Sequence, residues 1–331
     1  MQKYKYSFIV PVYNRPDEVE ELLDSICNLE FSENNKIPFE VIIVEDGSTV
    51  PCKDIVDKYI GKFEIQYFMM EKNSGYCVVP RNFGADFATG NYLVFLDSDI
   101  LLHPKYLMEV DEALSKNDLD SFGGPDAAHP SFNNFQKAIS HSMTSFWTTG
   151  GIRNKKKPLS GKYSPRGFNF GIKKDVFMEI EKFPQIMPGE DILLGHKLIK
   201  ANYKVELIEN AVVYHKRRSS FKKYWKQVFL FGRGRVNLNR KLPETTSIVH
   251  YLPTVFILFC GLSLVGSIFN IYILLPLAFY IFLVFVDATV KNKSLIIGGI
   301  SVITAFIQHF GYGFGFLKES FSNKPINEKY H

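Results

Sequence analysis

Residues 92–99, YLVFLDSD, decide the fold class of this chain. Five consecutive apolar or aromatic residues form a run that is typical of a buried strand, and the run ends at two aspartates. Residues 7–12 (SFIVPV) and 39–44 (FEVIIV) repeat the pattern and are followed by YNRP and EDGS. These stretches predict buried strands with polar clusters at their carboxyl ends.

Helical patterns separate these runs. The expected strands are residues 7–12, 39–44, 65–69, 92–96, 168–172, 204–208 and 211–214, and the expected helices are 17–29, 53–60, 190–201 and 221–231, with 84–89 on a further helix. Strands that alternate with helices predict an α/β fold with a mostly parallel, Rossmann-like sheet. Such sheets bind ligands beyond the carboxyl ends of their strands. Residues 119–183 are looser in pattern, and we expect acceptor-binding loops there.

The last third of the chain is apolar. Residues 248–267, 271–289 and 295–317 are each close to the roughly 20 residues that a helix needs to cross a bilayer. The alternative is a buried hairpin of a larger soluble core. We expect four parts: a catalytic domain over 1–218, a basic amphipathic interfacial helix over 219–241, a transmembrane region of two or three helices over 248–317, and a polar tail over 318–331.

Charge and cysteine content narrow the class of protein. A net charge of +5 is too small to indicate a nucleic-acid partner, and the excess is concentrated in residues 155–157 and 216–241. Basic residues beside an apolar segment favour a lipid-bilayer partner and a multi-pass protein of the cytoplasmic (inner) membrane with a cytoplasmic catalytic domain. The four cysteines lack CxxC spacing, so neither disulfides nor a zinc site are expected. The first residues lack the apolar core of a secretory signal.

Asp97 and Asp99 are the first candidates for chemistry. Two carboxylates one residue apart at a strand end can face one ligand, and their hard oxygens suit Mg²⁺ or Mn²⁺ bridging a diphosphate. A solvated turn is the alternative. Asp46 ends an earlier strand, where a carboxylate can bind a ribose or a base while Gly47 permits close approach of the backbone; capping of a helix is its alternative role. Arg81 is a cation beside the same site, or else half of a surface ion pair.

A resemblance now becomes visible. FIVPVYNR, Asp46-Gly47-Ser48, the run NSGYCVVPRNFGADFATGNYLVFLDSD, Gly189-Glu190-Asp191 and Tyr214-His215 occur in the order seen in family-2 glycosyltransferases of the GT-A fold. The resemblance covers about residues 4–240. It implies that the nucleoside is held by Pro11, Tyr13, Asp46 and Arg81, the ribose or metal by Asp97, and the metal by Asp99. It also implies that Asp191 is the catalytic base and that His215 contacts metal or pyrophosphate. Within the same motifs, Arg15, Asn73, Gly75 and Ser98 are further candidates for binding the donor.

The expected reaction also requires such residues. An acceptor hydroxyl is a weak nucleophile, so a carboxylate should take its proton, and Asp191 at a helix start is placed for this, with Glu190 as the rival base. A single candidate base and no evident enzyme nucleophile favour inversion at the anomeric carbon. Arg217 and Arg218 follow His215 and are candidates for the pyrophosphate, although they could instead face lipid phosphates, as could Arg233 and Arg235.

We therefore expect an inverting glycosyltransferase that uses a nucleotide-diphosphate sugar, with a weak preference for uridine, and Mn²⁺ or Mg²⁺. Its acceptor would be a membrane-proximal or lipid-linked glycan. A processive polysaccharide synthase is less favoured, because Gln227 is followed by VFLFGRGR instead of the Gln-x-x-Arg-Trp motif of such enzymes. A non-catalytic nucleotide-sugar-binding membrane protein and a nucleotidyltransferase, which would release pyrophosphate, remain alternatives.

Overall fold

The computed structural model describes residues 4–32, 36–150, 163, 165–186 and 188–322. It divides into two compact units, which are described separately. The first unit contains Met1–Ala127 and Lys162–His215, and the second contains Ala128–Gly161 and Lys216–Asn327. Among the described residues, the contacts thus group 128–150 with the C-terminal helices. The basic residues 155–157 and the last part of the polar tail, 323–331, lie outside the described residues.

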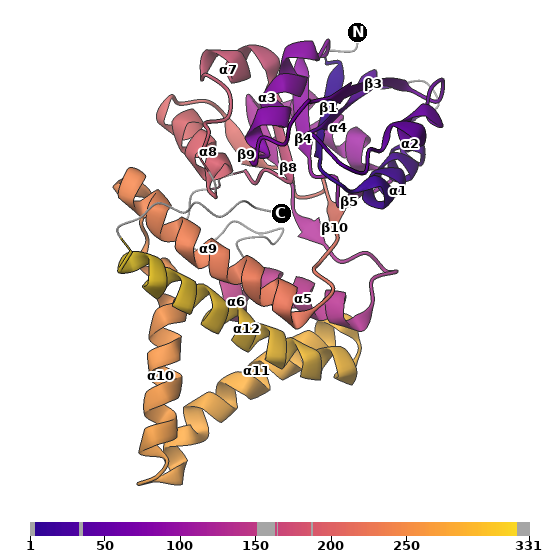
Figure 1. Cartoon of the computed structure of the whole chain (residues 1–331). Coiled ribbons are helices and arrows are strands. Elements are labelled where there is room, and N and C mark those ends of the chain that lie inside the picture. Colours follow the sequence, from indigo (N-terminus) through magenta and orange to yellow (C-terminus); the bar gives the residue numbers. More distant parts are fainter. Residues whose placement is uncertain (1–3, 33–35, 151–162, 164, 187, 323–331) are drawn as a thin grey trace. The chain divides into compact units, whose positions relative to one another are not determined.

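A seven-stranded sheet forms the centre of the first unit (Figure 1). Its order is β3-β2-β1-β4-β8-β6-β9, and β1 to β4 are mutually parallel while β8 runs antiparallel to both of its neighbours. The strands are β1 Tyr6–Val12, β2 Phe39–Glu45, β3 Glu64–Met69, β4 Tyr92–Leu96, β6 Ser121–Gly123, β8 Asn169–Lys173 and β9 Val205–Leu207. The expected mostly parallel α/β sheet is confirmed.

Helices cover both faces of this sheet, because alternate residues of each strand point to opposite faces. In β1, Phe8 and Val10 belong to one apolar core and Ile9 belongs to the other. The helices of this unit are α1 Pro16–Cys27, α2 Lys53–Asp57, α3 Val78–Phe87, α4 Tyr106–Asn117, α7 Lys174–Glu179 and α8 Glu190–Lys200. The central strands β1, β2 and β4 are therefore buried almost throughout, which explains why they appear in the sequence as continuous apolar runs. Strands β3 and β9 are only partly buried.

A second, smaller sheet was not predicted. It has the order β5-β10-β7, with β5 Ile100–Leu102, β10 Val213–His215 and β7 Asp126–Ala127. The region 119–183 was expected to hold loops and one strand at residues 168–172; it contains that strand as β8, and in addition β6, β7, α7 and two helices of the second unit. Strand β10 runs antiparallel to β5, so His215 lies opposite Ile100, directly after the DSD sequence. This pairing positions the candidate site.

The second unit is helical. Its helices are α5 Asn134–Thr144, α6 Phe146–Thr149, α9 Phe221–Lys241, α10 Leu252–Gly266, α11 Leu275–Asn292 and α12 Leu295–Ser320, with short 3-10 turns at Pro243–Thr245, Ile248–His250 and Ile271–Leu274. Helix α9 extends ten residues beyond the helical pattern expected at 221–231 and ends at Lys241, where the expected interfacial segment 219–241 also ends. Of the three expected membrane segments, two, Ile271–Asn292 and Leu295–Ser320, are long and apolar enough to cross a bilayer, whereas α10 has only 15 residues.

Candidate active site

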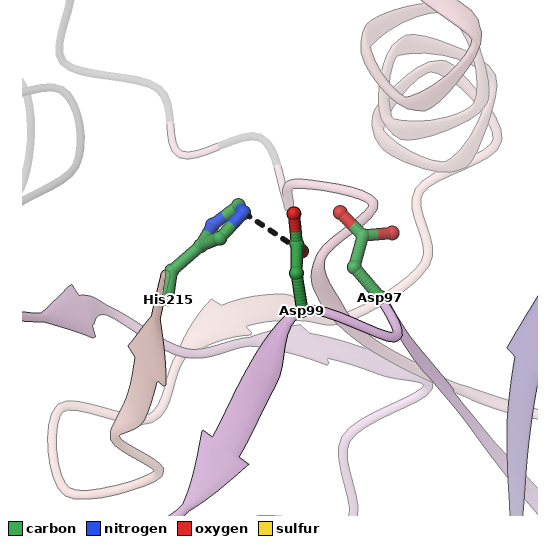
Figure 2. Close-up of side chains that lie close together, drawn as sticks. All are labelled: Asp97, Asp99 and His215. Atoms are coloured by element: carbon green, nitrogen blue, oxygen red, sulfur yellow. Dashed lines mark ion pairs between the residues drawn. The ribbon is translucent and has the colours of Figure 1, made fainter. Parts of the chain in front are cut away.

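Three potential metal ligands converge in the first unit (Figure 2). Asp97 directly follows β4, Asp99 directly precedes β5, and His215 ends β10. One ligand atom from each residue lies within 4.8 Å of the others, and the His215 Nε2 is 3.2 Å from Asp99 Oδ1. Residues 116 positions apart in the sequence therefore share one site at the carboxyl end of β4.

Arg15 adds a cation to this cluster. It stands at the start of α1, and its Nη1 lies 2.7 Å from Asp99 Oδ2. Burial alone would raise the pKa of Asp99, but His215 and Arg15 outweigh burial and hold the pKa of this carboxyl well below its usual range. Asp99 is therefore ionised at every pH at which the protein is expected to work.

Arg81 connects the two ends of the site. Its guanidinium is almost fully buried, and Nη2 lies 2.5 Å from Asp97 Oδ1 and donates to the Gly167 carbonyl oxygen at 3.0 Å. Its Nη1 lies 3.6 Å from Glu190 Oε1. A side chain added at Gly167 would place a Cβ 2.8 Å from Arg81 Nη1, so the guanidinium would have to shift. Arg81 thus holds a metal candidate and a candidate base in fixed relation.

Glu190 and Asp191 begin α8, and their environments differ. Asp191 Oδ2 accepts a hydrogen bond from the Gly167 amide at 3.1 Å, and its side chain is half-buried. Burial, followed by the charge of Asp191, raises the pKa of Glu190 to about 7, although Arg81 opposes the shift. The Glu190 side chain lies against Arg81 and Cys77, whereas Asp191 accepts from the Gly167 amide.

Asp46 organises the loop expected to hold the nucleoside. The Ser74 amide donates to Asp46 Oδ1 at 2.9 Å, and the Ser74 hydroxyl donates to Oδ2 at 2.8 Å. Asn73 Nδ2 donates to the Asp46 carbonyl oxygen at 3.0 Å, and the Asn73 Oδ1 accepts from the Gly75 amide. The carboxylate expected to bind the donor therefore also fixes the loop that contains Asn73 and Gly75.

The turns after β1 and β2 are joined by Asn14. Its Oδ1 accepts hydrogen bonds from the Thr49 and Val50 amides, and its own amide donates to Ser48 Oγ at 2.9 Å. The other donor-site candidates lie nearby in the chain: Pro11 is in β1, Tyr13 follows it and is half-buried, and Ser98 is buried between the two aspartates.

The arginines expected at the pyrophosphate belong to the second unit. Arg217 is buried there, with Nη2 3.4 Å from Ser140 Oγ, and Arg218 follows it before α9 begins. The structure does not bring either residue together with the aspartates within one unit. Their role at the pyrophosphate stays a prediction.

Three contributors were not identified from the sequence. Asp126 Oδ2 lies 3.7 Å from His215 Nδ1, Ser74 bonds Asp46, and Gly167 links Arg81 to Asp191. Asp126 follows Gly-Gly-Pro in the sequence. An acidic residue directly after such a glycine-rich stretch was the sequence feature that could have indicated its role. Ser74 lies inside the quoted motif run, whereas nothing near Gly167 in the sequence marks it.

The cluster fits a small divalent cation. Two carboxylates and an imidazole offer oxygen and nitrogen donors of the kind that Mn²⁺ accepts, and carboxylates also suit Mg²⁺. The Asp97 side chain is 32% exposed, so a diphosphate can reach this side of the cluster, whereas Asp99 and His215 are mostly buried. The residues present therefore suit a cation that is shared with a ligand.

The sheet is that of a GT-A-like fold, and the chain belongs to glycosyl transferase family 2, whose profile matches residues 7–181. The poly(ribitol-phosphate) beta-N-acetylglucosaminyltransferase TarS of Staphylococcus aureus (strain Mu50) is 37% identical over 105 residues, covering 32% of this chain and 18% of TarS. The chain thus matches about a fifth of the length of that relative. Glycosyltransferase AglE of Haloferax volcanii is 22% identical over 235 residues, covering 70% of this chain and 73% of AglE.

Solved structures agree on the fold. The mannosyltransferase PcManGT from Pyrobaculum calidifontis, in complex with GDP-Man and Mn²⁺, matches with a TM-score of 0.59 and 15% identity, covering 97% of this chain and 88% of that one. S. aureus TarS 1-349 in complex with UDP-GlcNAc matches with a TM-score of 0.50 and 18% identity, covering 92% and 90%. At these identities the likeness concerns the fold alone.

Proposed function

We propose that this chain transfers a sugar from a nucleoside-diphosphate donor to a hydroxyl of a membrane-proximal or lipid-linked acceptor, with inversion at the anomeric carbon. The observation that carries the proposal is the convergence of Asp97, Asp99 and His215 within 4.8 Å, beyond the end of a sheet strand. Mn²⁺ or Mg²⁺ held there would neutralise charge that develops on the departing nucleoside diphosphate.

Residues of the chain itself supply the other functions that the proposed reaction needs. Asp46 and the loop that it fixes support the nucleoside, and Arg15 supplies a positive charge beside the aspartates. Asp191 accepts the proton of the acceptor hydroxyl as the oxygen attacks the anomeric carbon, a contribution that is typically about 10²- to 10⁴-fold. The amide of Gly167 orients Asp191, since it donates to Oδ2 at 3.1 Å. Glu190 supports Arg81 and is the rival base.

The names of the relatives support a choice of donor and acceptor classes. TarS is a poly(ribitol-phosphate) N-acetylglucosaminyltransferase, and its neighbouring structure contains UDP-GlcNAc. A uridine diphosphate sugar and a hydroxyl of a cell-surface polymer are therefore the first pair to assay. We place the reaction at the cytoplasmic membrane, because seven basic residues of α9 precede two helices that are apolar enough to span it.

The test is to compare Asp191→Asn with wild type in a panel of nucleotide sugars with Mn²⁺. We expect donor binding, measured by equilibrium dialysis, to persist while transfer falls at least about 100-fold. Asp57→Asn, an exposed acid of the same unit, is the control and should leave both unchanged. Transfer that survives in Asp191→Asn but is lost in Glu190→Gln would assign the base to Glu190.

Product analysis separates the rival functions. Release of nucleoside diphosphate with an inverted product supports the proposal. Release of pyrophosphate would indicate a nucleotidyltransferase, retention would exclude Asp191 as the base of a single displacement, and long polymers would indicate a processive synthase. Donor binding without turnover of any acceptor or water would favour a binding protein.

A further inference from the structure

One face of helix α12 is buried against the other helices of the second unit, with buried residues from Ile297 to Glu319. In its first half, Thr304 Oγ1 lies 2.6 Å from Ser142 Oγ of α5. In its middle, Gln308 Oε1 accepts from the Tyr224 hydroxyl of α9 at 2.6 Å, and near its end Glu319 Oε2 accepts from Arg233 Nε of α9 at 2.9 Å. The apolar composition of α12 therefore includes a polar stripe that faces protein.

Helix α9 runs parallel to the second half of α12 and very close to it. Contacts progress from Tyr224 with Gln308 to Arg240, which donates to the carbonyl oxygens of Glu319 and Ser322. A Cβ at Gly232 would lie 2.0 Å from the Tyr312 carbonyl oxygen, and one at Gly315 would lie 2.0 Å from that of Phe229. Because glycines permit this approach, the two helices must occupy the same depth relative to any membrane.

Helix α9 cannot lie in hydrocarbon. It contains seven basic residues and no acidic residue within 21 positions, and charged side chains are strongly disfavoured at the bilayer centre. Its first turns present exposed Phe221 and Trp225 beside exposed Lys222, Lys223 and Lys226. Aromatic rings interleaved with lysines suit the headgroup region of an anionic membrane. Helix α12, held against α9, must then also lie at the surface.

Helices α10 and α11 have the opposite character. No Asp, Glu, Lys or Arg occurs between Glu244 and Asp287. The base of this pair packs on α12, since Gly313 closely approaches Pro253 of α10 and Gly298 closely approaches Thr289 of α11. The two helices extend away from α12 and meet at the turn that joins them (Figure 1). In that turn, Ile268 and Phe269 are 80% and 85% exposed.

Backbone amides at that turn have hydrogen-bond partners within the protein. The amides of Ser267, Ile268, Phe269 and Asn270 donate to carbonyl oxygens between residues 263 and 266, and the Tyr272 amide donates to Asn270 Oδ1. In lipid, backbone donors must find partners within the protein, since water is absent. A turn that carries no charge, buries no apolar side chain and satisfies these amides fits a bilayer better than water.

We infer that α10 and α11 form a hairpin that enters and leaves the bilayer from one side, while α9 and α12 lie on that surface as its base. The turn around Asn270 stays within the membrane, and α12 does not cross it, despite having the length and composition to do so. Residues on both sides of the hairpin, Lys223 of α9 and Lys318 of α12, are then on the same side of the membrane. The partner is the lipid bilayer.

Cysteine labelling tests this topology in sealed vesicles that contain the full chain. Lys223→Cys, Lys318→Cys and Asn270→Cys are each made in a Cys27→Ser background, which removes the exposed native thiol. A membrane-impermeant maleimide should label the first two in vesicles of the same orientation and label Asn270→Cys only after detergent is added. Labelling of Lys318→Cys solely in the opposite orientation would show that α12 crosses. Labelling of Asn270→Cys from the far side would show that the turn reaches water. Either result overturns the inference.

A second experiment identifies what covers the turn. The double variant Ile268→Glu/Phe269→Glu places charges at the most exposed positions, and Ile60→Glu is the control at an exposed apolar site of the first unit. With phosphatidylcholine vesicles, which offer α9 no anionic lipid, the double variant should float with vesicles several-fold less than the control. Unchanged flotation, or a change from dimer to monomer in detergent without lost flotation, would show that protein covers the turn.

Discussion

Arg15 Nη1 lies 2.7 Å from Asp99 Oδ2, so the second acid of the Asp-Ser-Asp sequence is paired with the residue that opens α1. His215 lies against the other oxygen of the same carboxylate. The site therefore contains its own positive charges where a divalent cation would bind. A cation that enters must compete with Arg15 for Asp99.

This competition predicts the behaviour of Arg15→Gln. Removing the guanidinium should strengthen Mn²⁺ binding in the absence of donor by about three- to ten-fold, since a partly buried charge pair contributes on the order of 1 kcal/mol. The spectrum of free Mn²⁺ by electron paramagnetic resonance measures the affinity. Lys58→Gln, which removes an exposed ion pair with Glu20, should change nothing. Weaker Mn²⁺ binding in Arg15→Gln would mean that Arg15 holds Asp99 in place instead of competing.

Gly47 and Gly61 make a matched pair for the donor loop. Both have positive φ, +64° and +87°, but a Cβ at Gly47 would lie 2.3 Å from the Asn73 amide nitrogen, whereas Gly61 has open space. Gly47→Ala should displace residues 72–74 and weaken binding of the nucleoside diphosphate at least about ten-fold. Gly61→Ala should cost only the backbone strain, about 1 kcal/mol, and leave binding intact. Titration calorimetry with the nucleoside diphosphate distinguishes the two, and equal affinities would exclude the 72–74 loop from binding.

The raised pKa of Glu190 predicts that the stability of the folded protein depends on pH. Burial, followed by Asp191, raises the pKa of Glu190 from 4.5 to about 7, so the folded protein retains a proton that the unfolded chain loses. The resulting stabilisation is complete below about pH 4.5 and disappears as the pH rises to about 7. Glu190→Gln cannot ionise, so it should be more stable than wild type by up to about 3 kcal/mol at pH 8 and nearly equal at pH 5. Urea denaturation at both pH values, with exposed Glu181→Gln as control, measures the difference.

We expect the buried ion pair of Glu319 to stabilise the packing of α9 against α12. The Glu319 carboxylate is fully buried, 2.9 Å from Arg233 Nε and 3.8 Å from Arg240 Nη1. Glu319→Gln removes the charge opposite buried Arg233, so unfolding in detergent should become easier by about 3–5 kcal/mol. Glu112→Gln breaks an exposed pair with Lys116 and should stay within about 0.5 kcal/mol of wild type. A thermal midpoint equal to that of the control would show that the pair contributes nothing.

The central strands could be predicted because they are buried on both faces. Residues 7–12, 39–44 and 92–96 are continuous apolar runs for this reason, and each ends in the polar residues that form the site. Strand β8 was expected as a strand, but its antiparallel position between β4 and β6 was not. Five residues, NFGIK, contain no information about direction, which depends on partners that lie more than 40 residues away.

Individual residues of the candidate site could be predicted from the sequence more readily than their arrangement in space. Asp97 and Asp99 are one residue apart, and local geometry is enough to predict that both can face one ligand. His215 joins them only because β10 pairs with β5, a contact between three-residue strands that no sequence pattern marks. The basic run after His215 indicated further cations for the same ligand. The contacts instead place Arg217 in the other unit, because the chain leaves the first unit after His215.

The third apolar segment was the least well defined for a physical reason. Its glycines, glutamine and histidine are unusual in a lipid-facing helix, and in the structure Gly311, Gly313, Gly315, Gln308 and His309 are all buried against neighbouring helices. Hydropathy averages over a helix and cannot report which face is covered. The small and polar residues lie on the covered face, but the sequence alone does not show which helices cover it.

The register of β8 has a consequence for how such proteins diversify. Asn169 lies opposite Leu96, so the chain enters this strand directly beside the acids, and Gly167 reaches Arg81 and Asp191 within two residues of the first paired position. Length changes upstream of Arg166 leave that alignment untouched, whereas a one-residue deletion between Gly167 and Lys173 would turn every inward side chain outward. Segments grafted before Arg166 should therefore alter which substrate is accepted while the reacting groups keep their spacing.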